Sequence, residues 1–245
     1  MKITFLGTAD GKPRKGHHQS ATMVEIGERI YLFDAGAPVV DILLDADKDL
    51  EKIKGFFNTH AHSDHLNGLP SLMEAALWKK ETDYDLYLAE EETITLMEAI
   101  LPYTTCAPIP KDRLRMHTIT GAGLVSDDGY LRVTAIPNAH MGERPSYSFL
   151  IEGEGKRVLL TGDMSYLLGK GDFPVVDGEL DLLITEMAHF SDVELAPYLE
   201  KSNAKMVAIH HYQERRLPEI ANLTGEGRFP FPVLRAEDGM MLEIV

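Results

Sequence analysis

Alternating and helical patterns of hydrophobic positions divide the chain into short strands and amphipathic helices. The segments that predict strands are Lys2–Gly7, Ala21–Ile26, Arg29–Asp34, Gly55–Thr59, Leu86–Ala89, Arg115–Ile119, Gly123–Ser126, Tyr130–Pro137, Ser146–Glu152, Arg157–Thr161, Leu182–Thr185, Lys205–Ile209 and Met240–Val245. The segments that predict helices are Pro38–Asp45, Gly68–Lys80, Glu91–Leu101, Val193–Leu199 and Leu217–Leu223. The prolines of Pro102–Asp112 predict an irregular connection or lid. This order of elements favours an α/β protein with two packed sheets and outer helices, and no linker divides residues 1–245 into separate domains.

A dense group of histidines and acids lies between the strand Gly55–Thr59 and the helix Gly68–Lys80. His60, His62, His65 and Asp64 fall within six residues, in the run Asn58-Thr59-His60-Ala61-His62-Ser63-Asp64-His65. A strand-to-helix loop lets such side chains converge on one point. Imidazole nitrogen and carboxylate oxygen are donors that suit zinc and related ions. The loop is therefore predicted to be the centre of a metal site.

Four later strands each deliver a histidine or acid at the carboxyl-terminal end. The residues concerned are His140, Asp163, Glu186 with His189 just beyond, and the adjacent pair His210-His211. Metal sites are usually completed by segments that are distant in sequence. His140 and Asp163 are therefore predicted to join the loop histidines as ligands.

Composition limits the classes of partner and compartment. The chain has 245 residues, a hydrophobic content of 44% and a formal net charge of −15, and the acidic surface disfavours nucleic-acid binding. Cys106 is the only cysteine, which excludes an intrachain disulfide and a thiolate cluster. No signal peptide precedes the first strand, and no apolar run reaches the length of a membrane span. We expect a cytoplasmic protein with a small-molecule substrate and no membrane partner, and the sequence leaves a homodimer open.

The motif set resembles the metallo-β-lactamase superfamily. The pattern His60-x-His62-x-Asp64-His65, followed by His140, by Asp163 in Thr161-Gly162-Asp163 and by a final histidine after an apolar strand, carries the likeness. Asp34 in Phe33-Asp34-Ala35-Gly36 matches an early aspartate of that superfamily, and Ala236-Glu237-Asp238-Gly239-Met240 is similar to a frequent ending there. The likeness spans nearly the whole chain and implies an αββα sandwich of two mixed sheets with a dinuclear site at one edge.

The resemblance also implies a ligand set for two divalent metal ions, zinc foremost, with manganese, iron or cobalt compatible. His60, His62 and His140 would hold one ion, while Asp64, His65 and a terminal histidine would hold the other, with Asp163 bridging. His210 is preferred as the terminal ligand because it directly follows the apolar strand, which would leave His211 to face substrate or solvent. Asp34 is expected to brace the loop by hydrogen bonds.

Such a site implies hydrolysis by a metal-bridged hydroxide. Two cations lower the pKa of a bridging water, and Asp64 would both bind metal and orient the nucleophile. The leaving group needs a proton, for which His189, His211 and a metal-bound water are candidates; His189 is the residue that we assign. His17 and His18, in the loop after the first strand, are expected to face solvent.

The substrate class is less closely defined than the fold. Phe5-Leu6-Gly7-Thr8 and Phe33-Asp34-Ala35-Gly36 look most like the RNase Z and small phosphodiesterase branch. The stretch Met164–Leu180, with Gly169-Lys170-Gly171, is too short for an arm that grips tRNA, so a small cyclic phosphodiester is favoured. Alternatives are hydrolysis of a carboxylic ester, thioester or lactone, and a non-catalytic metal-binding sensor. A di-iron oxidoreductase is disfavoured, because His62 stands where such proteins typically carry an acid.

Overall fold

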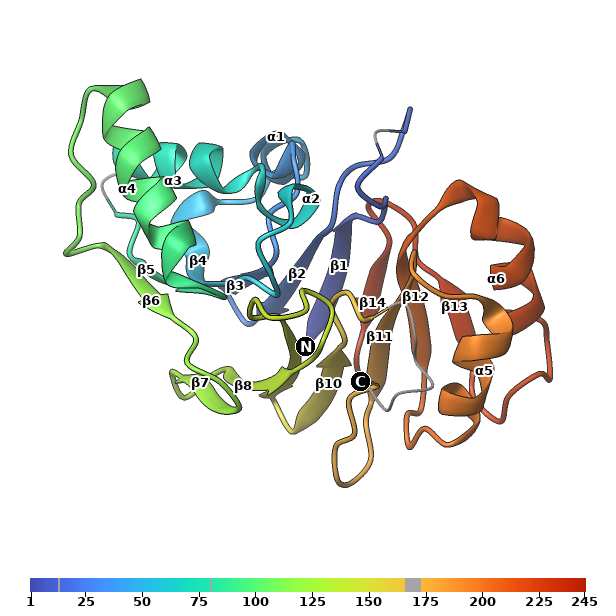
Figure 1. The fold of residues 1–245 in the computed structure, drawn as a ribbon. Helices are drawn as coiled ribbons and strands as arrows, with labels where there is room; N and C mark the ends of the chain where they lie inside the picture. Colours follow the sequence, from blue (N-terminus) through green and yellow to red (C-terminus); the bar gives the residue numbers. More distant parts are fainter. Residues whose placement is uncertain (13, 80, 166–172) are drawn as a thin grey trace.

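Two seven-stranded sheets form the centre of the computed structural model, which describes all of the chain except residues 13, 80 and 166–172 (Figure 1). The strands are β1 Lys2–Gly7, β2 Ala21–Ile26, β3 Arg29–Phe33, β4 Ile53–Phe57, β5 Tyr84–Leu88, β6 Leu114–Thr118, β7 Gly123–Asp127, β8 Arg132–Pro137, β9 Tyr147–Gly153, β10 Lys156–Leu160, β11 Leu182–Met187, β12 Val207–Tyr212, β13 Val233–Arg235 and β14 Met241–Glu243. The helices are α1 Val39–Asp45, α2 Ser63–Leu66, α3 Leu69–Trp78, α4 Glu91–Thr105, α5 Asp192–Glu200 and α6 Leu217–Leu223.

Both sheets are mixed, as predicted. The first has the order β14-β1-β2-β3-β4-β5-β6, with antiparallel pairs from β14 to β3 and parallel pairs from β3 to β6. The second has the order β13-β12-β11-β10-β9-β8-β7, with antiparallel pairs from β7 to β10 and parallel pairs from β10 to β13. Parallel neighbours end at the same edge of a sheet, so the polar residues that follow β10, β11 and β12 are brought together.

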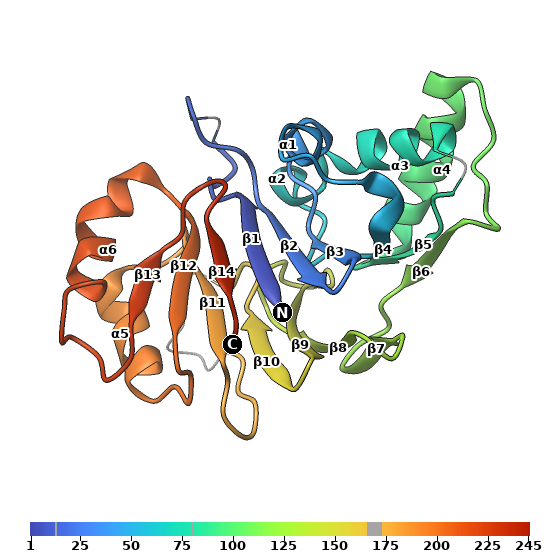
Figure 2. The same cartoon turned by 180° about the vertical axis from the view of Figure 1, so that it is seen from behind.

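The two sheets pack face to face on an aromatic core. The rings of Phe33 and Phe57 are stacked with centroids 4.9 Å apart, and Phe149 of the second sheet meets Phe57 edge-on at 6.1 Å. Helices α1, α3 and α4 cover the outer face of the first sheet, while α5 and α6 cover that of the second (Figures 1 and 2). This confirms the predicted layers. No helix in the described part of the chain is both long and apolar enough to cross a membrane.

Helix α4 and strand β13 differ from the sequence prediction, and the short helix α2 lies where a loop was predicted. Helix α4 runs through Pro102 to Thr105, where an irregular connection was predicted, and ends at Cys106 in the left-handed conformation with φ 53°. The Thr105 Oγ1 hydroxyl donates to the Leu101 carbonyl at 2.7 Å, which helps to satisfy the last turn of the helix. The short strand β13 was not predicted, since its three residues are too few to show an alternating pattern.

Candidate metal centre

The histidine-rich loop leaves β4 and enters α2 at the edge of the first sheet. Asp34, at the end of β3, has φ 60° and lies under this loop. Its Oδ2 accepts hydrogen bonds from His65 Nδ1 at 2.7 Å and Thr59 Oγ1 at 2.8 Å, while Oδ1 accepts from the Thr59 amide at 2.8 Å. A β-carbon at Gly36 would lie 2.6 Å from the Asp64 carbonyl oxygen, so only glycine permits this close approach. Asp34 therefore braces the loop, as predicted.

The first cluster combines two loop histidines with residues from the second sheet. Ligand atoms of His60, His62, His140 and Asp163 all lie within 4.8 Å of one another. His62 Nδ1 is 3.0 Å from His60 Nε2 and 3.1 Å from His140 Nε2. Asp163 Oδ2 is 3.8 Å from His60 Nε2 and 3.6 Å from His140 Nε2. The four residues predicted around this point are thus brought together.

The second cluster lies on the other side of Asp163. Ligand atoms of Asp64, His65 and His211 also lie within 4.8 Å of one another. His65 Nε2 is 3.3 Å from Asp163 Oδ1, and His211 Nε2 is 3.2 Å from Asp163 Oδ2. The Asp163 carboxylate therefore stands between the two clusters, as a bridging group would.

His211, and not the predicted His210, reaches the second cluster. The pairing of β11 with β12 contains a bulge: Glu186 lies opposite His210 and Met187 opposite Tyr212, so that His211 is the extra residue, with φ 48°. Such a bulge redirects a side chain at a sheet edge. The ring of His210 instead lies 5.9 Å from that of Phe5, and burial, together with the charge of His211, lowers its pKa to about 3. The preference for His210 is corrected by this geometry.

The outer ring nitrogens of three histidines are held by the protein, which turns the inner nitrogens toward the clusters. His60 Nδ1 is 2.9 Å from Thr59 Oγ1, His140 Nδ1 donates to the Met164 carbonyl at 2.9 Å, and His65 Nδ1 donates to Asp34. Residues that fix the orientation of a ligating imidazole in this way are usual around metal ions.

The electrostatics and donor set fit divalent cations. Burial, followed by the neighbouring imidazoles, lowers the pKa of His60, which favours the neutral form that binds metals. Burial would raise the pKa of Asp163, but His211 and His65 outweigh it and hold that pKa well below its usual range. Within the described chain, the buried His65 Nε2 and Asp163 Oδ1 atoms lie 3.3 Å apart but make no hydrogen bond. Ions at the two clusters would satisfy these atoms.

His189 lies beside the first cluster and is paired with a buried acid. Its ring is 4.7 Å from that of His140, and its Nδ1 donates to Glu186 Oε1 at 2.8 Å. Glu186 also accepts from the Met164 and Ala188 amides, both at 2.8 Å. Burial lowers the pKa of His189, but the hydrogen bond and charge of Glu186 outweigh burial and raise it to about 9. The sequence pointed to both residues as strand-end groups, although not to their contact.

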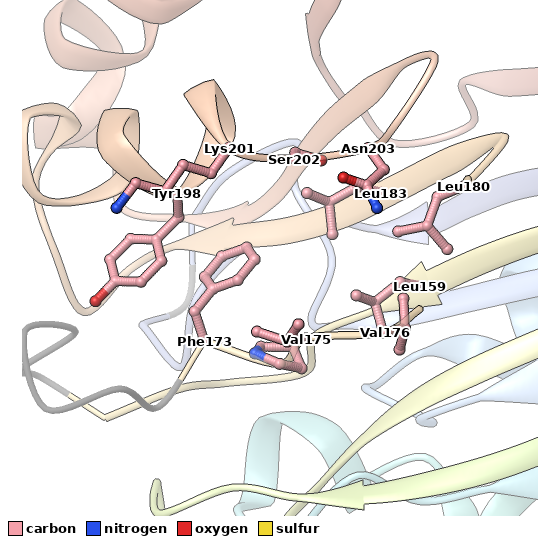
Figure 3. A pocket seen from close by; sticks show the side chains of 11 residues that line it. Leu159, Phe173, Val175, Val176, Leu180, Leu183, Tyr198, Lys201, Ser202 and Asn203 are labelled. Atoms are coloured by element: carbon pink, nitrogen blue, oxygen red, sulfur yellow. The ribbon is translucent and has the colours of Figure 1, made fainter. Parts of the chain in front are cut away.

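Two other features lie apart from the clusters. His18 faces the carboxylate of Asp238, with its Nδ1 3.1 Å from Asp238 Oδ2, and its side chain is 41% exposed. An apolar pocket of about 250 Å³ lies between α5 and the segment after Phe173, with Leu159, Leu183 and Tyr198 in its wall (Figure 3). None of its lining residues belongs to either cluster.

Replacing Asp34 by asparagine should weaken metal retention by about 10- to 100-fold, because its single acceptor oxygen cannot serve both His65 Nδ1 and the Thr59 amide. Asparagine tolerates positive φ, so the backbone at this position should persist. Competition with a chelator would measure the affinity, with Asp41→Asn on the exposed face of α1 as the control. Unchanged affinity in Asp34→Asn would show that the brace does not tune the site.

Comparisons with known proteins agree with this geometry. Ribonuclease Z from Synechococcus sp. (strain WH7803) is 30% identical over 159 residues, which cover 62% of this chain and 48% of that protein. Ribonuclease BN from Cronobacter sakazakii (strain ATCC BAA-894) is 33% identical over 166 residues, which cover 64% of this chain and 51% of that protein. The chain thus spans about half the length of the curated relatives that it matches.

Solved structures with a similar backbone cover nearly the whole chain. The short form of human tRNase Z superposes with a TM-score of 0.77 at 21% identity and covers 100% of both chains. The metallo-β-lactamase fold protein YhfI from Bacillus subtilis has a TM-score of 0.75 at 18% identity, over 98% of both chains. A diphosphatase from the PhnP family has a TM-score of 0.69 at 19% identity, over 99% of this chain and 97% of the other. These likenesses show the metallo-β-lactamase fold.

A family model described as "Anti-Pycsar protein Apyc1" matches residues 1–230. This match covers every strand of the two sheets except β13 and β14, and every residue of the two clusters. The chain therefore has the metallo-β-lactamase fold with histidine and aspartate clusters suited to metal ions, and it belongs to the anti-Pycsar Apyc1 family.

Proposed function

We propose that this chain is a dinuclear metal-dependent phosphodiesterase that acts on a small cyclic phosphodiester, most simply a cyclic nucleotide. The observation that carries the proposal is the position of Asp163, whose two carboxylate oxygens face His65 of one cluster and His60 and His140 of the other. Two groups of donors that share one carboxylate are suited to a pair of closely spaced ions.

The ligand assignment follows from the two clusters. In this proposal His60, His62 and His140 would hold one ion, Asp64, His65 and His211 would hold the second, and Asp163 would be shared between them. When bound, the two ions supply positive charge to the phosphate oxygens and a water of lowered pKa as nucleophile. The Asp64 carboxylate would accept a hydrogen bond from that water and so orient it.

Two observations support a small phosphodiester as the substrate class. Membership of the Apyc1 family favours a small cyclic nucleotide. The formal net charge of −15 disfavours a long nucleic acid. The predicted absence of a tRNA-gripping arm concerned Gly169-Lys170-Gly171, which lies outside the described residues.

His189 is the proposed proton donor to the leaving group. Replacing it by alanine should lower kcat on a cyclic nucleotide by about 10²- to 10⁴-fold, since the departing alkoxide needs a proton. The same variant should lose far less activity on bis(p-nitrophenyl) phosphate, whose leaving phenolate is stable without one. Steady-state kinetics on both substrates would measure the two losses. Equal losses would mean that His189 acts on something other than the leaving group.

A substrate panel tests the proposed function. The metal-loaded protein would be offered cyclic nucleotides, bis(p-nitrophenyl) phosphate, an aryl ester, a thioester, a lactone and a pre-tRNA. We expect turnover of the cyclic nucleotides, and its loss in Asp64→Ala. Turnover of the ester, thioester or lactone alone would instead assign a carboxylic-acid derivative as substrate, while cleavage of the pre-tRNA alone would assign tRNA processing. No turnover at all would favour a sensor.

A further inference from the structure

Asp10 is a nearly buried acid that the proposed mechanism does not use. It lies in the loop after β1 and is 7% exposed. Six acids of the described chain are buried: Asp10, Asp34, Asp64, Glu90, Asp163 and Glu186. Asp34, Glu90 and Glu186 accept hydrogen bonds, and Asp64 and Asp163 belong to the metal clusters. No hydrogen bond or ion pair joins Asp10 to another described residue, and its carboxylate oxygens are not among the fully enclosed unpaired side-chain atoms, so they stay open to a donor from outside the protein.

The loop that carries Asp10 lies directly against the second cluster. A β-carbon added to Gly11 would lie 3.2 Å from Asp64 Oδ2, so the backbone at this point passes close to that carboxylate. The charges of Asp64 and His211 both act on Asp10, as do those of Lys12 and Arg14 from the same loop. Asp10 therefore lies at the side of the proposed reaction centre.

The start and end of this loop are held firmly in place. The Thr8 amide and hydroxyl donate to Asp238 Oδ1 at 2.9 Å and 2.7 Å, and the His18 amide donates to Asp238 Oδ2 at 2.6 Å. Ala9 forms bridges to Gln19 and to Tyr212, the residue after His211. These contacts fix the loop and with it the position of Asp10. A fixed carboxylate is suited to substrate recognition, because little conformational entropy is lost when the substrate binds.

The surroundings of Asp10 limit the chemical groups that its carboxylate can bind. It belongs to neither group of ligand atoms that converge within 4.8 Å in the two metal clusters, so it is not placed as a metal ligand. An ionised carboxylate only accepts hydrogen bonds, and it repels a phosphate oxygen. Its partner in a bound substrate must therefore be a donor. In a 3′,5′-cyclic nucleotide the 2′-hydroxyl sits on the carbon next to the one that bears the phosphate oxygen, so a phosphate at the clusters brings this hydroxyl close.

We propose that Asp10 accepts a hydrogen bond from the sugar hydroxyl beside the phosphate and makes the site selective for ribonucleotides over 2′-deoxyribonucleotides. The inference rests on the proposed function and adds a specificity-determining residue to it. A hydrogen bond to a charged group supports a preference of about ten- to a hundredfold.

The test compares one 3′,5′-cyclic ribonucleotide with its 2′-deoxy analogue. For metal-loaded wild type, Asp10→Ala and Asp10→Asn, both kcat/KM and the Kd by calorimetry would be measured for each compound. Asp45→Asn on the exposed end of α1 is the control variant. We expect wild type and the control to prefer the ribonucleotide by at least about tenfold, Asp10→Ala to show a ratio near one, and Asp10→Asn, which keeps one acceptor oxygen, to lie between them.

The outcomes separate this inference from the proposed function. Turnover of both compounds with the same ratio in wild type and Asp10→Ala would overturn the role of Asp10 and leave the phosphodiesterase in place. Equal losses on both compounds in Asp10→Ala would also overturn it, since they indicate a structural role. Binding that prefers the ribonucleotide through Asp10, without turnover, would support the inference and refute the enzyme. A wild type that binds neither compound would overturn both.

Discussion

Replacing Asp163 by alanine should leave fewer than two bound ions per chain and lower turnover of a cyclic nucleotide by at least about 10³-fold. Asp163 is the residue whose carboxylate faces both clusters, with distances of 3.6 Å to His140 Nε2 of the first and 3.3 Å to His65 Nε2 of the second. Its removal takes a shared anionic ligand away from both ions at once. Several kcal/mol of transition-state stabilisation depend on such ions, and each 1.4 kcal/mol corresponds to a factor of ten in rate.

Metal content by elemental analysis and kcat on the same preparation would measure this effect. Asp177→Ala, which removes an exposed acid, is the matched control and should keep two ions and full turnover. Circular dichroism would establish that Asp163→Ala is folded. A folded Asp163→Ala that retains two ions and most of its activity would contradict the bridging role.

Replacing His211 by alanine should have a far larger effect on activity than replacing its neighbour His210. His211 Nε2 faces Asp163 and Asp64 at 3.2 Å and 3.7 Å, whereas both nitrogens of His210 are buried without a hydrogen-bond partner in the described chain. We therefore expect His211→Ala to lose the ion of the second cluster and about 10²-fold or more in turnover.

His210→Ala is the matched control, because it removes the same side chain one residue away. It should keep two ions and its activity, but it should lose about 1–3 kcal/mol of unfolding free energy as buried packing is lost. Urea unfolding with metal analysis on both variants would measure the difference. Loss of an ion in His210→Ala, with metal retained in His211→Ala, would restore the original preference for His210.

The sequence was sufficient for the layers of the fold and for most of the candidate site. The run from His60 to His65 is dense enough to stand out on its own, and His140 and Asp163 were found because each follows a predicted strand. Parallel strands that end at one edge then bring these distant residues together, which is a consequence of topology that the order of elements already suggests.

The parts of the candidate site that the sequence could not show depend on irregularities of single residues in the backbone. His211 reaches the cluster through a bulge that adds one residue to β12, and an alternating pattern carries no sign of it. The contact of Glu186 with His189 depends on a tight turn after β11, for which the only signal was their spacing of three residues. Neither the hydrophobic pattern of the sequence nor a motif singled out Asp10, because its significance lies in its burial beside Asp64.

The most direct test is a titration of the metal-stripped protein with zinc or manganese while hydrolysis of a cyclic nucleotide is followed. We expect no turnover without metal and a rise that saturates at two ions per chain. Turnover by the metal-free protein, or none at any metal content, would contradict this expectation.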